Sequence, residues 1–178
     1  MTVGRERCKS GKIIIRILKI ESSEGFAVSA IHPSVAMMFN QILVAVKFSP
    51  ASLFALEKGI QLAKSHDATL YLFHALDYRL QDLSDTDPRI ITALKEVEKQ
   101  FESEVIPRLA GLSDVKYEFR PADPALEVCK LARVIDADLI VLGCHQIRAK
   151  MCLGRVDYVG MTILEKAHCP IILVPYNE

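Results

Sequence analysis

The residues best suited to binding a ligand follow a short apolar run, residues 138–143, with the sequence DLIVLG. The next twelve residues, CHQIRAKMCLGR, carry the cations Arg148, Lys150 and Arg155, and a helix is predicted from Val156. A strand that gives way to a cationic, glycine-bearing loop and then to a helix is typical of an anion site, because backbone N–H groups at a helix start point toward the ligand. We therefore predict an anionic ligand where this strand ends.

A further cation, Lys47, directly follows the first regular apolar run of the chain, residues 41–46. Ligands of open parallel sheets bind at the carboxyl ends of the strands, so Lys47 is expected to lie near the loop that follows Gly143. A plainer alternative exists for each charge. Arg148 and Lys150 are then solvated loop residues, and Lys47 pairs with a nearby carboxylate.

Three neighbouring residues, Cys144, His145 and Cys152, are types that bind zinc. They include no CxxC pair, and adjacent residues of a strand point to opposite faces, so we interpret them as packing or loop residues and predict no metal. The histidines His74 and His168 are interpreted as hydrogen-bonded polar groups.

No Ser/His/Asp set that would support nucleophilic catalysis is visible in the sequence. Ser49 and Ser52 are explained as helix-start residues, because a serine hydroxyl accepts a hydrogen bond from a free backbone N–H group there. We therefore predict no enzymatic activity and no catalytic residue.

Composition narrows the class of protein. The chain has 178 residues, of which 51% are hydrophobic and 25% charged, enough for one substantial core in one soluble domain. Its 22 basic and 22 acidic residues cancel and it has no Trp, so nucleic acid is not expected as a partner, and no membrane association is predicted. Five scattered cysteines indicate reduced thiols and hence a cytoplasmic protein.

The first 36 residues differ from the rest of the chain. They hold six basic and three acidic residues, a net charge of +3, which leaves −3 for the remainder. Residues 12–20, KIIIRILKI, are apolar enough for a short strand but too short to span a bilayer. We predict that residues 1–36 are an N-terminal extension, weakly ordered or upstream of a natural start at Met37 or Met38, and that the domain occupies residues 38–178. A signal peptide is a less favoured alternative.

From Asn40 onward, apolar runs of strand length alternate with helical patterns. Residues 41–46 read as a central strand buried on both faces, and residues 115–120, which alternate apolar with charged side chains, read as an edge strand with one solvated face. The further strands are predicted at residues 69–76, 138–143 and 169–175. Helices are predicted at 50–65, 87–109, 124–137 and 156–167, with Ser49 and Asp123 as N-caps. Pro107 is expected to bend or end the second of them. This order predicts an open parallel sheet with helices on both faces.

Several stretches carry a resemblance to a known family. The segments ILVAVKFSPASLFALEKGIQLA, FRPADPALEVCKLARVIDADLIVLGCH and EKAHCPIILVP are similar to the universal stress proteins over nearly all of residues 40–175. This resemblance implies a three-layer α/β/α domain of the nucleotide α-hydrolase-like type, with five parallel strands in the order 3-2-1-4-5. It also implies a homodimer through the last strand, at Ile171, Ile172, Leu173 and Val174.

The family's nucleotide-binding branch places an aspartate at the end of the first strand and the loop pattern Gly, two residues, Gly, nine residues, Gly, Ser or Thr after the fourth. Here Lys47 replaces the aspartate, Gln146 the second glycine and Arg155 the hydroxyl residue, and seven residues separate Gln146 from Gly154. The ligand positions that the resemblance implies are Ala45, Val46, Lys47, Ala75, Leu142, Gly143, His145, Gln146, Arg148, Lys150, Gly154, Arg155 and Val156.

Three hypotheses follow. The first, which the departures favour, is a non-catalytic homodimeric stress-response protein whose nucleotide site has departed from the pattern and which acts through protein contacts or a small anionic ligand. The second is a protein that binds ATP or another adenine nucleotide through the backbone of residues 45–47, Ala75 and residues 142–143, with basic residues replacing the lost loop contacts. The third is a nucleotide hydrolase, which would require a catalytic carboxylate or metal pair that the sequence does not offer.

Overall fold

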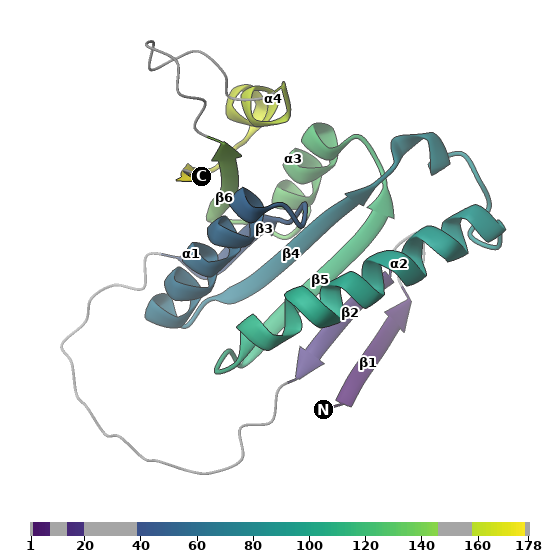
Figure 1. The fold of residues 1–178 in the computed structure, drawn as a ribbon. Helices are drawn as coiled ribbons and strands as arrows, with labels where there is room; N and C mark the ends of the chain where they lie inside the picture. The colour runs from purple at the N-terminus through teal and green to yellow at the C-terminus, as the bar shows by residue number, and fades with distance from the viewer. Residues whose placement is uncertain (1, 8–13, 20–38, 146–157, 177–178) are drawn as a thin grey trace.

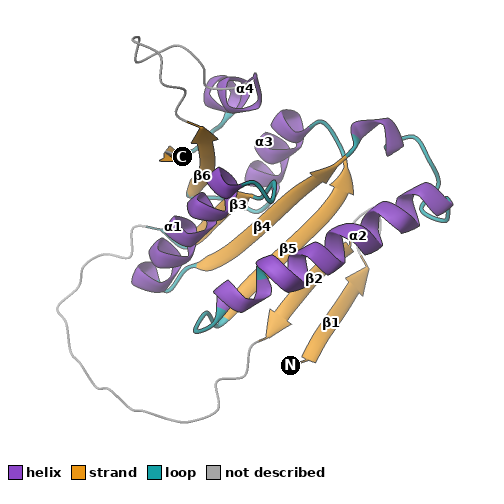
Figure 2. Cartoon of the chain, viewed as in Figure 1, coloured by secondary structure: helices purple, strands orange, loops and turns teal. Residues whose placement is uncertain are grey.

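A computed structural model describes residues 2–7, 14–19, 39–145 and 158–176 (Figure 1). The strands are β1 (Thr2–Arg7), β2 (Ile14–Lys19), β3 (Gln41–Ala45), β4 (Thr69–Leu76), β5 (Asp114–Pro121), β6 (Leu139–His145) and β7 (Ile171–Tyr176). The helices are α1 (Pro50–His66), α2 (Pro88–Glu104), α3 (Pro124–Val134) and α4 (Tyr158–Lys166), with short 3₁₀ helices η1 (Tyr78–Leu80) and η2 (Ile106–Leu109). Figure 2 shows how the strands form one sheet between helices.

The parallel part of the sheet has the order β5-β4-β3-β6-β7, and all four neighbouring pairs in it are parallel. Numbered along the predicted domain, this is the order 3-2-1-4-5, so the predicted three-layer α/β/α sheet is confirmed. One core cluster lies on the face covered by α1 and α2, and a second lies on the face covered by α3 and α4. The two layers of helices follow from the direction of the crossovers, since β4 and β5 lie on one side of β3 while β6 and β7 lie on the other.

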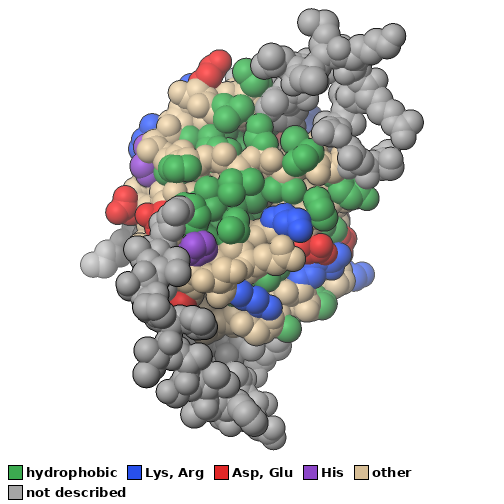
Figure 3. Space-filling view, turned by 90° about the vertical axis from the view of Figure 1, so that its left-hand side faces the viewer, with side chains coloured by type: hydrophobic (Ala, Val, Ile, Leu, Met, Phe, Trp, Pro, Cys, Tyr) green, Lys and Arg blue, Asp and Glu red, His purple; other side chains and the backbone are tan. Residues whose placement is uncertain are grey.

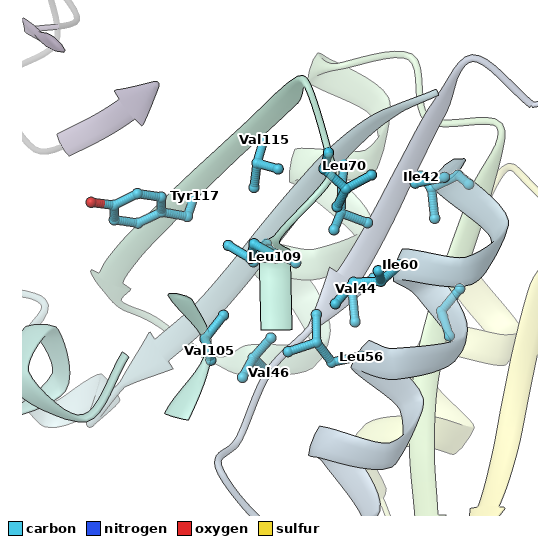
Figure 4. Close-up of a cluster of buried hydrophobic side chains, with 14 of the residues drawn as sticks. Ile42, Val44, Val46, Leu56, Ile60, Leu70, Val105, Leu109, Val115 and Tyr117 are labelled. Atoms are coloured by element: carbon cyan, nitrogen blue, oxygen red, sulfur yellow. The ribbon is translucent and has the colours of Figure 1, made fainter. Parts of the chain in front are cut away.

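The predicted central strand is β3. Its residues Ile42, Leu43 and Val44 are fully buried, Ile42 and Val44 toward α1 and Leu43 toward α3. A continuous apolar run is what a strand covered on both faces requires. Figure 4 shows Ile42 and Val44 packed against Leu56 and Ile60 of α1 in the first of the two clusters.

The predicted sheet edge at residues 115–120 is wrong, because β2 pairs antiparallel with β5 and β1 extends the sheet beyond it. The expected solvated face is also wrong, since Glu118 is only 5% exposed and forms an ion pair with Arg120. Arg120 pairs in turn with Glu127 of α3, so charge on this strand marks a buried cluster. The strand-like stretch at residues 12–20 contains β2. The separate, weakly ordered character of residues 1–36 stays a prediction.

Helix boundaries follow the predicted capping residues. Asp123 Oδ1 accepts a hydrogen bond from Leu126 N at 2.9 Å and Pro124 opens α3, while Ser49 caps α1 ahead of Pro50. Within the predicted helix over residues 87–109, α2 ends at Glu104 and Pro107 lies in η2, which confirms that the regular helix stops near this proline. In the first turn of α2, Ile90 is buried and Ile91 is 39% exposed, while Phe101 in the last turns is buried. No helix within the described ranges is long and apolar enough to cross a lipid bilayer.

Candidate functional site

A cavity of about 740 Å³ lies at the carboxyl ends of β3, β4 and β6, beside the first turns of α3 and α4. The strand that follows β3, β4, lies on one side of it, and β6 lies on the other side. The strand order therefore reverses at β3. Parallel α/β sheets bind ligands at such a point, and the volume falls in the range of about 300–1,000 Å³ that is usual for ligand pockets. The cavity is therefore the candidate site.

Small and apolar residues form much of the cavity wall. Ala45 is the last residue of β3 and Ala75 the last but one of β4, both on the face covered by α3 and α4, and their short side chains leave space above the sheet. Phe73, which is 1% exposed, and Leu142 lie beside them. Such a wall suits a flat, largely apolar group better than a highly charged one.

One side of the cavity is made by the start of α1. The Lys47 N–H group donates to Ser52 Oγ at 2.7 Å, and Ser52 Oγ donates to the Ala45 carbonyl oxygen at 3.5 Å. Phe48 bridges strand and helix with a φ of 56°, a conformation that L-residues adopt rarely. These contacts place the exposed side chain of Lys47 at the rim of the cavity. Among the described lining residues, Lys47 is the one Lys or Arg.

His74 also lines the cavity, and its imidazole is committed to a structural bond. Its Nδ1 donates to the Val46 carbonyl oxygen at 2.7 Å, which leaves Nε2 as the unprotonated nitrogen. The ring packs against Phe48 and Phe119, and burial lowers the pKa of His74 below its ordinary value. A neutral, hydrogen-bonded imidazole confirms the interpretation of His74 as a satisfied polar group.

The segment after β4 supplies a wall that sequence reasoning missed. Asp77 and Tyr78 line the cavity, and the Asp77 carboxylate accepts hydrogen bonds from the backbone N–H and guanidinium of Arg79. The hydrogen bonds from Arg79 hold the pKa of Asp77 below its usual value. The sequence Asp-Tyr-Arg directly after a predicted parallel strand could have indicated this wall, since ligands bind at the carboxyl end of such strands.

The structure brings together six of the thirteen ligand positions implied by the resemblance: Ala45, Val46, Lys47, Ala75, Leu142 and Gly143. His145 ends β6. The other six positions, Gln146, Arg148, Lys150, Gly154, Arg155 and Val156, lie outside the described residues. The described lining residues that sequence reasoning did not assign to the site are Ser49, Ser52, Phe73, His74, Leu76, Asp77, Tyr78, Ala122, Pro124, Val128, Cys144, Val159, Gly160 and Leu173.

Cys144 lies at the cavity and is half-buried, and within the described chain neither it nor Cys129 nor Cys169 forms a disulfide. Within the ranges that the structure describes, no group of three His, Cys, Asp or Glu side chains is arranged to hold a metal ion. Cys152, the third residue of the zinc hypothesis, lies outside those ranges.

The sequence pattern of the Universal stress protein family matches residues 38–175. The chain belongs to the universal stress protein family. A universal stress protein of Methanocaldococcus jannaschii is 27% identical over 143 residues, which cover 77% of this chain and 82% of that protein.

Solved structures of universal stress proteins share the fold. One from Archaeoglobus fulgidus, in complex with dAMP, has a TM-score of 0.56 at 21% identity and covers 77% of this chain and 98% of its own. Another universal stress protein, in complex with cAMP, has a TM-score of 0.51 at 20% identity and covers 76% and 96%. At these identities the likeness establishes the fold.

Proposed function

We propose that this universal stress protein is a non-catalytic binding protein for a small adenine nucleotide. The observation that carries the proposal is the cavity at the reversal of the strand order, whose wall of Ala45, Ala75 and Leu142 suits a flat base. Two solved relatives are described in complex with dAMP and with cAMP, each an adenine nucleotide with one phosphate. The proposal combines the small anionic ligand of the first hypothesis with the adenine base of the second.

Lys47 supports a ligand with a single phosphate group. The family's nucleotide-binding pattern has a carboxylate at this position, whereas this chain presents an ammonium group at the rim of the cavity. A lysine ammonium is attracted to phosphate oxygens, and it cannot accept hydrogen bonds from sugar hydroxyls as a carboxylate does. The phosphate is therefore proposed to lie toward Lys47 and the start of α1.

The non-catalytic part of the proposal is supported by the bonding of the cavity's polar side chains. Ser52 is bonded to the backbone of Lys47 and Ala45, and His74 to the backbone of Val46. Asp77 is paired with Arg79. General acid–base catalysis needs a group free to reach the reacting atoms, and each of these is held by a structural partner.

Homodimerisation through β7 is part of the proposal. In the described sheet β7 pairs with β6 and is the last strand in the order. Of the four predicted edge residues, Ile172 is 37% exposed, whereas Leu173 lines the cavity and Val174 is buried. Met161 and Leu164 of α4 are exposed as well, and Figure 3 shows hydrophobic side chains gathered on the face that lies on the left in Figure 1. An unpaired apolar edge is stabilised when a second copy covers it.

The cytoplasm is the proposed location, since the described cysteines form no disulfide, as in reducing compartments.

The direct test combines recovery of a ligand with titration. Mass spectrometry of the denatured, freshly purified protein is expected to detect an adenine nucleotide, and calorimetry of the stripped protein to show binding of AMP or cAMP. Lys47→Gln is expected to weaken AMP binding more than adenosine binding, while Lys58→Gln, a cation of α1 away from the cavity, leaves both unchanged. Absence of binding by every one of these ligands, or measurable turnover of the nucleotide, contradicts the proposal.

A further inference from the structure

Tyr78 is an aromatic residue of the cavity wall that remains largely uncovered. It lines the cavity, yet 59% of it is exposed. Tyrosine rings contribute most when their faces are packed against other groups, and the described chain leaves this ring mostly open. Phe73, the other aromatic ring whose side chain lies on the cavity's face of the sheet, is fully buried and packed in the core. Tyr78 is therefore the wall residue with a ring face available to a ligand.

The backbone that carries Tyr78 is held in place from several sides. The Ala122 N–H group donates to the Leu76 carbonyl oxygen at 3.4 Å, which ties the end of β4 to the chain beyond β5. Within η1, Leu80 N donates to the Asp77 carbonyl oxygen and Gln81 N to the Tyr78 carbonyl oxygen, both at 3.0 Å. The position of the ring at the cavity is thus built into the fold.

The Asp77 carboxylate adds a side-chain clamp to this turn. It accepts Arg79 N at 3.0 Å, and Arg79 Nε lies 3.0 Å from Oδ1 and 2.9 Å from Oδ2. An arginine held by two carboxylate oxygens fixes geometry better than a single hydrogen bond does. Asp77 and Arg79 flank Tyr78, so the clamp restrains the turn on which the tyrosine is presented.

We propose that Tyr78 stacks on the base of the bound nucleotide and is a specificity-determining residue of the site, with Asp77 as its positioning residue. This inference rests on the proposed function. Base-on-aromatic stacking accepts any flat heteroaromatic ring and adds nothing for a ligand that lacks one. Tyr78 is therefore expected to make the site bind nucleotides more tightly than sugar phosphates.

The test compares Tyr78→Phe and Tyr78→Leu with the wild-type protein by calorimetric titration of AMP and of ribose 5-phosphate. Tyr78→Leu is expected to raise the Kd for AMP by about 5- to 150-fold, the range for loss of one stacked base. Tyr78→Phe is expected to keep the wild-type Kd within about twofold, because the ring remains. Neither change is expected to alter the weak binding of ribose 5-phosphate, and the exposed position of Tyr78 allows both variants to fold, which thermal unfolding verifies.

The role of Asp77 is tested by combining Asp77→Asn with Tyr78→Leu. A positioning residue acts through Tyr78, so Asp77→Asn is expected to weaken AMP binding in the wild-type background and to have no further effect in the Tyr78→Leu background. Asp87→Asn is a matched control, because Asp87 makes the same fork with Arg89 at the start of α2, away from the cavity. An effect of Asp77→Asn that persists beside Tyr78→Leu overturns the positioning role.

The outcomes separate this inference from the proposed function. AMP binding that is equally tight in wild type and Tyr78→Leu overturns the stacking role while the proposed function stands. A wild-type protein that binds neither AMP nor cAMP nor adenosine overturns both. A loss of affinity in Tyr78→Phe equal to that in Tyr78→Leu shows that the hydroxyl, and not the ring, contacts the ligand, and also overturns the stacking role.

Discussion

Gly143 lies so close to the start of α1 that a Cβ atom at this position would be 2.3 Å from the carbonyl oxygen of Ala51. The same atom would lie 2.8 Å from the backbone nitrogen of Ser52. Real Cβ atoms do not approach backbone atoms this closely, so glycine is required for β6 to pack against α1. The family resemblance assigns Gly143 to a nucleotide loop, and the packing explains this glycine without any ligand.

Gly143→Ala is therefore expected to destabilise the protein whether or not nucleotide is present. Forcing a methyl group into this contact must shift backbone, and overpacking of this kind lowers the free energy of unfolding by about 1–3 kcal/mol. Urea denaturation measures the change. Val134→Ala, at a position 75% exposed on α3, is the control and is expected to stay within about 0.5 kcal/mol of wild type. Wild-type stability of Gly143→Ala contradicts the packing requirement.

The ion cluster between β5 and α3 gives a second prediction. Arg120 pairs with both Glu118 and Glu127, and all three side chains are at least 85% buried. Arg120→Met leaves both buried carboxylates without the arginine, with Lys130 remaining near Glu127 only, and is expected to lower the free energy of unfolding by about 3–5 kcal/mol. Arg108→Met breaks the exposed pair between Arg108 and Glu57 and is expected to lower it by less than about 1 kcal/mol.

Chemical denaturation of both variants checks the contrast between the two ion pairs. Adding Glu118→Leu to Arg120→Met is expected to recover part of the loss, because one of the uncompensated charges is removed. Similar stabilities for Arg120→Met and Arg108→Met would show that the cluster does not behave as a buried one.

The burial of His74 is expected to make the free energy of unfolding depend on pH. Burial lowers the pKa of His74 in the folded protein below its ordinary value of 6.5, so the unfolded chain binds the proton more readily. The stability contributed by the neutral imidazole is complete above pH 6.5 and is lost as the pH falls through the folded-state pKa. The free energy of unfolding is expected to be lower at pH 5.5 than at pH 7.5.

Urea titrations at the two pH values measure this difference. In His74→Gln the difference is expected to shrink, and in His168→Gln, where the histidine is exposed, it is expected to match wild type. If His74→Gln retains the full wild-type difference, another group is responsible for the pH dependence.

The β7 edge predicts the oligomeric state. Light scattering at micromolar concentration is expected to give the mass of a dimer. Ile172→Lys is expected to give the mass of a monomer, because a charge at the exposed edge position opposes pairing with a second copy. Ile91→Lys, an exposed isoleucine on α2, is the matched control and is expected to remain dimeric. A wild-type monomer rules out the proposed assembly.

Much of the fold could be predicted because its signals are local. The apolar run of β3, the capping residues Ser49 and Asp123 and the prolines after them are patterns within a few neighbouring residues. The element order then implies a parallel sheet, and the family resemblance supplies the strand order. Boundaries were less secure, as α3 shows, which ends at Val134 and not at residue 137, because helix ends depend on tertiary contacts as well as on local sequence.

By itself, the sequence determined the class of fold, the family and the end of the sheet at which a ligand is expected. The tertiary structure decided what that end is made of. Asp77 and Tyr78 become cavity walls because β4 ends beside Lys47, thirty positions earlier, and β5 is not a sheet edge because β2, from the start of the chain, pairs with it. Contacts between residues far apart in the chain leave no local periodicity, and for that reason they are visible only once the strands are placed side by side.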